Sequence, residues 1–524
     1  MAILQAVARP AAPNALYYGD NLEILRSGKI TENSVDLCYI DPPFNSKRNY
    51  NQIYNRVGKE DIAQAEAFID TWVWNEQAVS GLRSILANEG NRFTAQTIEL
   101  IKGLHRVLGE DSLLAYVVSM AQRITEIQRV LTPEGTFYLH CDPTASHYLK
   151  LVCDAAFLPL GGMFRNEIVW CYAGGGIPRN DFPRKHDVIL RYSKGKNPYF
   201  KHEYRAYSPG TVQRGRTAIK GKYFKEGLRK EGTPVPDWWT SAREDVPKIT
   251  SPTDPEKLGY PTQKPKALLR RIIECSSKPG DLVLDAYCGC GTTIEVAQMT
   301  GRRWIGIDIT YQSISLVLYR LQKAFPTNYK EVLANIVLDG VPRDMDSARA
   351  LAVKADDRVR KEFEKWAILT YTSNLGIINT KKGADKGIDG TAYTQTGSKD
   401  NAKIILQVKS GHANRGDIAT LRGDMQREGA EMAVMITLEP PSKPMIAEAA
   451  SAGHYRHPLM NRDYPRIQIV TVEDIIERHV RLDVPLSMEV VRAATETDED
   501  LQTDIFEAET LPLSALVLEG EVED

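Results

Sequence analysis

A buried strand that runs into a glycine turn, a helix and a second buried strand constrains this chain more than any other feature. Residues 281–285 are apolar between two acids, and the turn Gly289-x-Gly291 follows. The stretch 292–300 has helical character, and residues 303–308 form a second apolar strand that also ends at an acid. This is the pattern of a βαβ unit, which belongs to a parallel sheet. The sequence therefore predicts an α/β fold.

The glycine turn and the second acid indicate the kind of ligand. Nucleotide-type cofactors require an acid at the end of the second strand, about 20 residues past the glycines. Asp308 stands at that position, where it can accept hydrogen bonds from both ribose hydroxyls. Ile294 occupies the place of the third glycine of a dinucleotide turn. No pyrophosphate needs to be held, which argues against a dinucleotide and favours S-adenosylmethionine.

A second motif, Asp41-Pro42-Pro43-Phe44, ends the apolar run 34–40. Each proline fixes φ near about −65° and has no N–H to donate. The Asp41 carboxylate and the Pro42 carbonyl can therefore both accept from one amino group, and Phe44 offers a flat stacking surface. Methylation of an exocyclic amine on a base taken out of the duplex needs these features. Alone, the motif is also an ordinary strand end; with the glycine turn it predicts amine methylation.

On these two motifs, the chain resembles the amino-group DNA methyltransferases of the β class, in which the catalytic motif precedes the cofactor motif. The resemblance implies a Rossmann-like S-adenosylmethionine-dependent methyltransferase sheet with a permuted motif order. It also implies double-stranded DNA as the substrate. The matching segments, in order along the chain, are 18–21, 41–44, 135–142, 185–187, 259–265 and 281–293.

The resemblance implies a set of cofactor-binding residues. Asp20 would contact the adenine of the cofactor, Asp285 its methionine amine and Asp308 its ribose. The segment 263–265 would help to hold the methionine end. The complete implied set is Asp20, Gln263, Lys264, Pro265, Asp285, Gly289, Gly291, Thr292 and Asp308.

The resemblance also bears on the target base. Family members with Asp at the first catalytic position mostly modify adenine N6, whereas Ser there goes with cytosine N4. Asp41 thus favours adenine N6, with cytosine N4 as the alternative. Phe44 replaces the commoner Tyr and keeps the stacking face.

Net charge does not reveal a DNA-binding protein, because it is only −2. Residues 191–230, however, carry twelve Lys and Arg against two acids, with aromatic residues between them. Such a stretch can neutralise phosphates while its rings and arginines reach bases. The β class keeps its target-recognition region here, at about 190–258 in this chain. A solvated basic loop is the alternative.

The stretch 354–483 predicts a separate α/β domain. Period-2 alternation in the strand 403–411 directs Gln407 and Lys409 to one face, and Asp389 precedes the hairpin and can converge on that face. An acid, a backbone carbonyl, an amide and a lysine form an Mg²⁺ site for phosphodiester hydrolysis. Other expected elements are helices at 358–370, 417–428 and 443–452 and strands at 432–438 and 467–472.

This region resembles the restriction-endonuclease-like PD-(D/E)xK fold in its Mrr-like branch, where Gln replaces the second acid. The resemblance implies that Asp389, Gln407 and Lys409 cleave DNA and that Asp389 and Gln407 bind the metal. Glu362 or Glu364 would complete the site. The alternatives are a domain that only binds DNA or a partner, and an ordinary turn beside a strand edge.

We therefore expect a methyltransferase domain at 1–350, an Mrr-like nuclease domain at 351–485 and a partly disordered acidic tail at 486–524. One polypeptide would then both modify and restrict DNA. No signal peptide and no apolar run of about 18 residues is found, so we expect a cytoplasmic enzyme without membrane contact. The sequence contains no Gly-x₄-Gly-Lys-Ser/Thr motif. A separate restriction or ATPase partner subunit, or a homodimer, is compatible with this interpretation.

Three other functions fit some of the same motifs. One is a solitary methyltransferase whose C-terminal domain does not cleave. Another is a modification-dependent nuclease whose N-terminal half only senses bases. The third is a methyltransferase for amines in RNA or protein. The cofactor motifs argue against the second function, and the nuclease-like domain favours DNA over the third.

Overall fold

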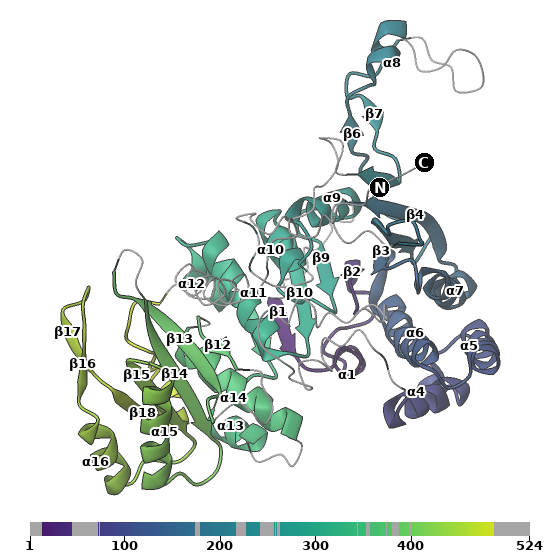
Figure 1. The fold of residues 1–524 in the computed structure, drawn as a ribbon. Helices are drawn as coiled ribbons and strands as arrows, with labels where there is room; N and C mark the ends of the chain where they lie inside the picture. The colour runs from purple at the N-terminus through teal and green to yellow at the C-terminus, as the bar shows by residue number, and fades with distance from the viewer. Residues whose placement is uncertain are drawn as a thin grey trace, which may run out of the picture. The chain divides into compact units, whose positions relative to one another are not determined.

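The computed structural model divides the chain into two compact units, one reaching Val341 and one beginning at Pro342 among the described residues (Figure 1). In the described part of the chain, no helix is long and apolar enough to cross a membrane. The described residues are 13–43, 72, 74–172, 179–215, 227–240, 256, 258, 263–342, 344–352, 357–373, 375–379, 387–397 and 401–486.

A nine-stranded sheet forms the centre of the first unit, with the order β11-β1-β10-β9-β2-β3-β5-β4-β8 in its described residues. The strands from β11 to β3 are parallel, whereas β5 is antiparallel to both of its neighbours. The bounds are β1 Asn14–Tyr18, β2 Val35–Ile40, β3 Leu131–Cys141, β4 Met163–Cys171, β5 His186–Ser193, β8 Trp238–Thr240, β9 Leu282–Asp285, β10 Arg303–Asp308 and β11 Ile336–Asp339.

Helices cover both faces of this sheet (Figure 1). On one face α6 is buried along most of its length and packs against α1, α4 and α7, while α9, α10 and α11 form the other layer. The Asp111 side chain caps α6 by accepting from the N–H of Leu114. The bounds are α1 Asn21–Arg26, α4 Glu76–Leu86, α5 Ala95–Leu108, α6 Ser112–Val130, α7 Ser146–Phe157, α9 Lys266–Ser276, α10 Thr292–Met299, α11 Tyr311–Ala324 and α12 Tyr329–Ala334, with 3-10 turns η1 Glu89–Asn91 and η2 Leu158–Leu160.

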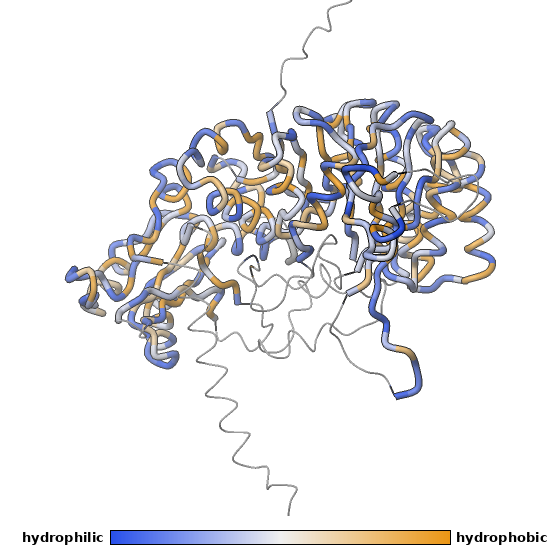
Figure 2. Tube along the Cα trace, turned by 90° about the horizontal axis from the view of Figure 1, so that it is seen from above, coloured by the Kyte–Doolittle hydropathy of each residue, from blue (hydrophilic) through white to orange (hydrophobic). Residues whose placement is uncertain are grey.

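The core of the first unit lies between the sheet and these helices. Parallel strands are covered on both faces, so β2 and β9 are nearly continuous apolar runs rather than alternating ones. In Figure 2 the coiled parts of the tube alternate between hydrophilic and hydrophobic residues along their length. A short arm made of β6 Tyr204–Arg205, α8 Pro209–Arg214 and β7 Thr233–Pro234 projects from this unit in Figure 1.

The second unit is built on a five-stranded sheet with the order β12-β13-β14-β15-β18 in its described residues. Strands β13 and β14 form an antiparallel pair, and β14, β15 and β18 are parallel, with α15 and α16 in the connections. The bounds are α13 Met345–Ala352, α14 Asp357–Tyr371, β12 Ile377–Ile378, β13 Gly390–Gln395, β14 Asn401–Lys409, α15 Arg415–Arg427, β15 Met432–Thr437, α16 Lys443–Ser451, β16 His454–His457, β17 Arg462–Pro465, β18 Ile467–Thr471 and α17 Val472–Ile476.

Candidate active site

The strand order of the first unit creates a crevice at the carboxyl ends of β9 and β2. These strands are parallel neighbours, with Leu37 opposite Val283. The chain leaves β9 toward β10 on one side and leaves β2 toward β3 on the other. Ligands of open α/β sheets bind at such a switch point. Asp285 ends β9 and Asp41 directly follows β2, so both predicted acids lie at this crevice.

The glycine turn after β9 has the conformation that its glycines allow. Gly289 and Gly291 have φ values of 48° and 77°, in the left-handed region. A Cβ atom on Gly291 would lie 2.7 Å from Val317, so this position has no room for a larger residue. Thr292 begins α10 and is buried. The predicted turn residues thus shape the loop between β9 and α10.

Asp308 is tied to the glycine turn through its own carboxylate. Its Oδ2 accepts from the N–H of Gly289 at 2.9 Å, and its Oδ1 accepts from the N–H of Thr310 at 3.0 Å. Burial raises the pKa of Asp308. The Thr310 hydroxyl also donates to Oδ1 at 3.1 Å, so Oδ2 is the oxygen that keeps a lone pair for a ligand hydroxyl.

Asp285 is the most strongly perturbed acid of the crevice. Burial and the negative charges of Asp41 and Asp308 raise the pKa of Asp285 to about 7, although hydrogen bonds from the Thr293 hydroxyl and the Tyr287 N–H act in the opposite direction. The charges of Asp41 and Asp308 thus disfavour the charged form of Asp285. A positively charged ligand would relieve this repulsion.

Asp20 also lies at this edge, because Gly19 donates its N–H to the carbonyl of Asp308 at 2.9 Å. The Asp20 side chain caps α1, with Oδ1 accepting from the N–H of Leu22 at 2.8 Å. Its Oδ2 accepts from Arg123 at 2.8 Å. The predicted adenine contact is therefore also a structural residue.

The predicted residues of the catalytic motif are described in part. Pro42 is buried and Pro43 is half-buried, whereas Phe44 lies outside the described residues. The ammonium of Lys264 forms an ion pair with Oδ2 of Asp41. This contact was not predicted, because the two residues lie far apart in the sequence.

The other residues of the predicted 263–265 segment have local roles. Gln263 accepts from the N–H of Leu258 at 2.9 Å and donates to the carbonyl of Glu256 at 2.8 Å. Pro265 is the N-cap of α9. The side chain of Gln263 therefore closes the loop that brings Lys264 to the crevice.

A buried chain of polar side chains was also missed. His140 lies between the hydroxyl of Tyr39 at 2.9 Å and the carboxylate of Asp187 at 3.1 Å. Tyr172 donates to the second oxygen of Asp187 at 3.0 Å. His140 and Asp187 each stand in segments that resembled family motifs, but nothing in the sequence indicated that they meet.

Part of the predicted basic surface is internal. Arg191 is buried in β5 and stacks on Phe200, with its guanidinium carbon 4.3 Å from the ring centre. Lys194 donates to the carbonyls of Arg129 and Leu131 at 3.0 and 2.8 Å. These two residues stabilise the fold and do not face solvent phosphates. The exposed basic residues of the described stretch are Lys196, Lys201, Arg214, Arg229 and Lys230.

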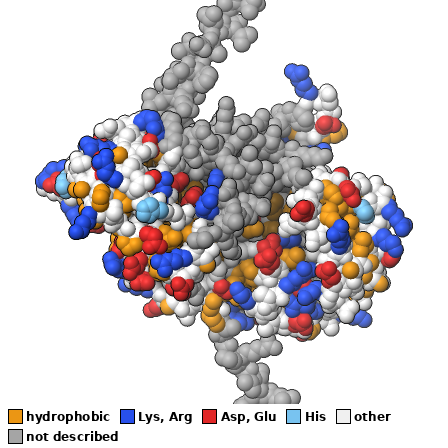
Figure 3. All heavy atoms as spheres, turned by 90° about the horizontal axis from the view of Figure 1, so that it is seen from below, with side chains coloured by type: hydrophobic (Ala, Val, Ile, Leu, Met, Phe, Trp, Pro, Cys, Tyr) orange, Lys and Arg blue, Asp and Glu red, His pale blue; other side chains and the backbone are white. Residues whose placement is uncertain are grey.

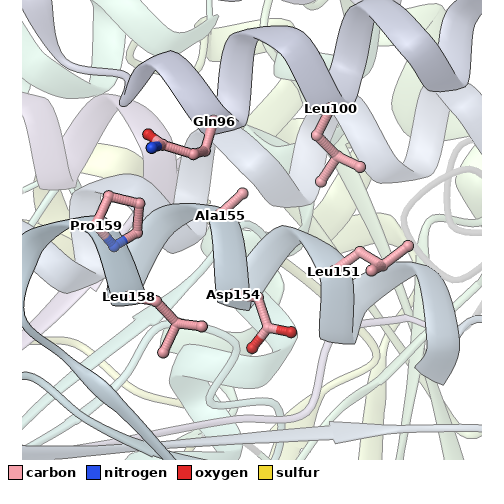
Figure 4. Close-up of a pocket in the computed structure, with 7 residues that line it drawn as sticks. All are labelled: Gln96, Leu100, Leu151, Asp154, Ala155, Leu158 and Pro159. Carbon is pink, nitrogen blue, oxygen red and sulfur yellow. The ribbon is translucent and has the colours of Figure 1, made fainter.

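In the view of Figure 3, acidic and basic side chains of the described residues are interspersed over the surface. A hollow lies between α5 and α7, and its Asp154 is bound by Lys150 and Tyr192 at 2.7 Å each (Figure 4). It therefore adds no reactive group. Its lining residues are Gln96, Leu100, Leu151, Asp154, Ala155, Leu158 and Pro159.

In the second unit, the predicted residues Gln407 and Lys409 lie in β14, and Asp389 directly precedes the neighbouring strand β13. Asp389 accepts from the N–H of Val408 at 2.7 Å. Gln407 is buried, and its Oε1 has no hydrogen-bond partner among the described residues. Lys409 forms an ion pair with Asp417 at 3.2 Å.

Acidic side chains are few around these residues. Among the residues that the structure describes, no group of three or more His, Cys, Asp and Glu side chains could hold a metal ion. Glu362, proposed to complete the site, accepts from Lys365 at 2.8 Å. Residues 360–477 match a family described as NACHT-associated inactive Restriction Endonuclease 1.

The solved structures that the chain matches include a complex of M1.HpyAVI with SAM. It has a TM-score of 0.32 and 18% identity, covering 59% of this chain and 98% of that one. The cytosine-N4-specific PvuII DNA methyltransferase has a TM-score of 0.36 and 15% identity, covering 64% and 98%.

Sequence relatives give a closer comparison. The chain is 28% identical over 311 residues to the DNA adenine methyltransferase YhdJ of Escherichia coli K12, covering 59% of this chain and 83% of the relative. It is 30% identical over 200 residues to the type II methyltransferase M1.MboII of Moraxella bovis, covering 37% and 74%. Residues 35–318 match the family model described as DNA methylase, which is named for N6 and N4 methylation. The chain therefore belongs to the N6/N4 DNA methyltransferase family.

Proposed function

We propose that this protein transfers a methyl group from S-adenosylmethionine to adenine N6 in double-stranded DNA. The observation that carries the proposal is the position of Asp41, an ionisable acceptor at the end of β2 beside the acidic crevice. Asp at this position favours adenine, and the name of the E. coli relative agrees with that choice. Cytosine N4 is the second candidate, because its amine presents the same two hydrogens.

The crevice fits S-adenosylmethionine by the chemistry of its acceptors. Asp285 is a buried acid that a cationic amine would stabilise, and Oδ2 of Asp308 keeps a lone pair for a ribose hydroxyl beside the glycine turn. When bound, this cofactor supplies a methyl group on a positively charged sulfur, and the carbon–sulfur bond breaks as the amine takes the methyl.

The chain's own part in the reaction is to hold the amine and remove its proton. The Asp41 carboxylate and the Pro42 carbonyl accept from the two amino hydrogens, which increases the electron density on nitrogen. The proton that the methylated nitrogen no longer holds passes to the Asp41 carboxylate. Stacking of the base on Phe44 stays a prediction.

Nucleoside analysis tests the proposal directly. Unmethylated plasmid is incubated with the full chain and S-adenosylmethionine, digested to nucleosides and examined by mass spectrometry. N6-methyldeoxyadenosine is the expected product. N4-methyldeoxycytidine as the product would support cytosine N4 methylation instead. Unmodified DNA, with every sequence context present in the plasmid, would refute both adenine N6 and cytosine N4 methylation.

Cofactor binding should depend on pH through Asp285. Since the pKa of Asp285 is raised to about 7, its carboxylate is protonated below that pH and cannot pair with a cationic amine. We expect the dissociation constant of S-adenosylmethionine to be roughly tenfold higher at pH 6 than at pH 8. Calorimetric titration measures it. Asp285→Asn should bind weakly and remove this step, and an unchanged profile in that variant would assign the step to another group.

Cleavage of DNA by the second unit stays a prediction. The Asp389 carboxylate accepts from the N–H of Val408, between Gln407 and Lys409 on β14, which supports cleavage. Asp389 and Gln407 would hold Mg²⁺, which would supply activated water, but this set contributes a single negative charge. The ion pair of Lys409 with Asp417 and the matched family's description as inactive weigh against it.

A plasmid assay decides the matter. Unmethylated plasmid is incubated with Mg²⁺ and no S-adenosylmethionine, with Asp389→Ala and Lys409→Ala in parallel. If the domain cleaves, wild type nicks or linearises the plasmid only with Mg²⁺ and both variants leave it intact. An intact plasmid in the wild-type reaction would contradict self-contained cleavage. A homodimer and a separate partner subunit also stay predictions.

A further inference from the structure

The residue that contacts the catalytic carboxylate comes from a segment expected to serve the cofactor. Lys264 precedes α9, and its ammonium lies against Oδ2 of Asp41. The two side chains are 13% and 16% exposed, so the pair is largely shielded from water. An ion pair that is shielded from water is stronger and better ordered than an ion pair at the surface. One oxygen of Asp41 is thereby occupied.

A second acid, Asp187 at the start of β5, also interacts electrostatically with Lys264. Burial acts to raise the pKa of Asp187, but its interactions with His140 and the nearby charge of Lys264 hold that pKa below its usual value. The charge of the Lys264 ammonium therefore acts on two carboxylates, and it pairs directly with that of Asp41. Asp187 is itself fixed, because His140 and Tyr172 bind its two oxygens.

The chain of contacts returns to the strand that carries Asp41. His140 is fully buried, and its second ring nitrogen bonds the hydroxyl of Tyr39, two residues before Asp41 on β2. Nε2 of the ring faces the Asp187 carboxylate, to which its N–H can donate, and Nδ1 faces the Tyr39 hydroxyl. Three adjacent strands, β2, β3 and β5, thus contribute to one polar chain beneath the catalytic residue.

We propose that Lys264 is a positioning residue for the catalytic carboxylate: it holds Oδ2 of Asp41 so that Oδ1 faces the target amine, and the charge of Asp187, held in place by the His140–Tyr39 chain, attracts the Lys264 ammonium. The inference rests on the proposed amine methylation and deepens it. It differs from the role that the resemblance implied, which was to hold the methionine end of the cofactor.

The two roles predict opposite kinetic results. If Lys264 positions Asp41, Lys264→Ala lowers kcat at least about tenfold and changes the dissociation constant of S-adenosylmethionine by no more than about twofold. Propylamine added to this variant should restore part of kcat, because it can place an ammonium beside Asp41. Lys264→Arg should keep more activity than Lys264→Ala. If Lys264 had only a structural role, propylamine would not restore kcat and Lys264→Arg would not be more active than Lys264→Ala.

Two further variants complete the experiment. Lys266 lies two positions away and pairs with Glu295 at 2.5 Å, so Lys266→Met is the matched control and should leave kcat unchanged. Asp187→Asn should lower kcat about threefold with unchanged cofactor affinity, because Asp187 acts through Lys264. It also gives a readout if Lys264→Ala fails to fold.

The outcomes separate this inference from the proposed function. Wild-type chain that methylates no DNA overturns both. Wild-type methylation with an unaffected Lys264→Ala variant overturns only the positioning role. The positioning role is also overturned if Lys264→Ala raises the dissociation constant of S-adenosylmethionine tenfold and leaves kcat unchanged. An unaffected Asp187→Asn variant refutes the part assigned to the buried chain.

Discussion

Replacing Asp41 by alanine is expected to lower the rate of methyl transfer by a factor of about 10²–10³, the usual cost of removing a group that acts mainly in the transition state. The variant loses the acceptor for one amino hydrogen and the base for the released proton. It also leaves the ammonium of Lys264 without its carboxylate partner at the reaction centre. Incorporation of labelled methyl groups into plasmid measures the rate.

Cofactor titration of the same variant separates catalysis from binding. The charge of Asp41 raises the pKa of Asp285. Removal of the Asp41 carboxylate therefore favours the charged form of Asp285 and should not weaken the binding of S-adenosylmethionine. Glu99→Ala on the exposed face of α5 is a suitable control and should retain full activity. Full methylation by the Asp41 variant would exclude the motif at 41–44 from catalysis.

Replacing Arg320 by methionine is expected to lower the free energy of unfolding of the first unit by about 2–3 kcal/mol, because Glu295 loses its buried hydrogen-bonded cation and keeps only the more exposed Lys266. The side chains of Arg320 and Glu295 are 4% and 3% exposed and lie 2.8 Å apart. Arg320 also donates to the carbonyl of Cys290 at 2.8 Å, inside the glycine turn. The substitution should therefore also loosen the cofactor loop.

Thermal unfolding of the full chain provides the measurement, read on the transition that S-adenosylmethionine shifts. Lys266→Met is again the control, because Lys266 binds the same Glu295 from a half-exposed position. Its loss should cost less than about 1 kcal/mol. If both substitutions lower the free energy of unfolding equally, the burial of Arg320 does not determine the size of the loss.

Local pattern predicted most of the regular structure. The βαβ unit expected at 281–308 is formed by β9, α10 and β10, because apolar runs, glycines and terminal acids are all local signals. In the second unit, the helix expected at 417–428 is α15, Arg415–Arg427, and the strand expected at 432–438 is β15, Met432–Thr437. The hairpin of β16 and β17 was not predicted, since its residues show no clear alternation.

Long-range pairing explains what the sequence did not reveal at the site. Lys264 and Asp41 are separated by 223 positions, and no local property of either residue indicates the other. The count of basic residues at 191–230 also gave a wrong prediction for Arg191, which it assigned to a basic surface. Its position in β5, on the same side of the strand as Asp187, directs it inward instead. Composition cannot distinguish a buried cation from an exposed one.

The adjacency of β2 and β9 has a consequence for how the protein is made. The N–H of Leu282 bonds the carboxylate of Asp36 across 246 positions, so this pairing closes a very long loop. During synthesis β2 has an unpaired edge until β9 leaves the ribosome, and such an edge invites aggregation. The catalytic crevice is therefore among the last parts of the first unit to assemble, and folding of that unit should be slow for its size.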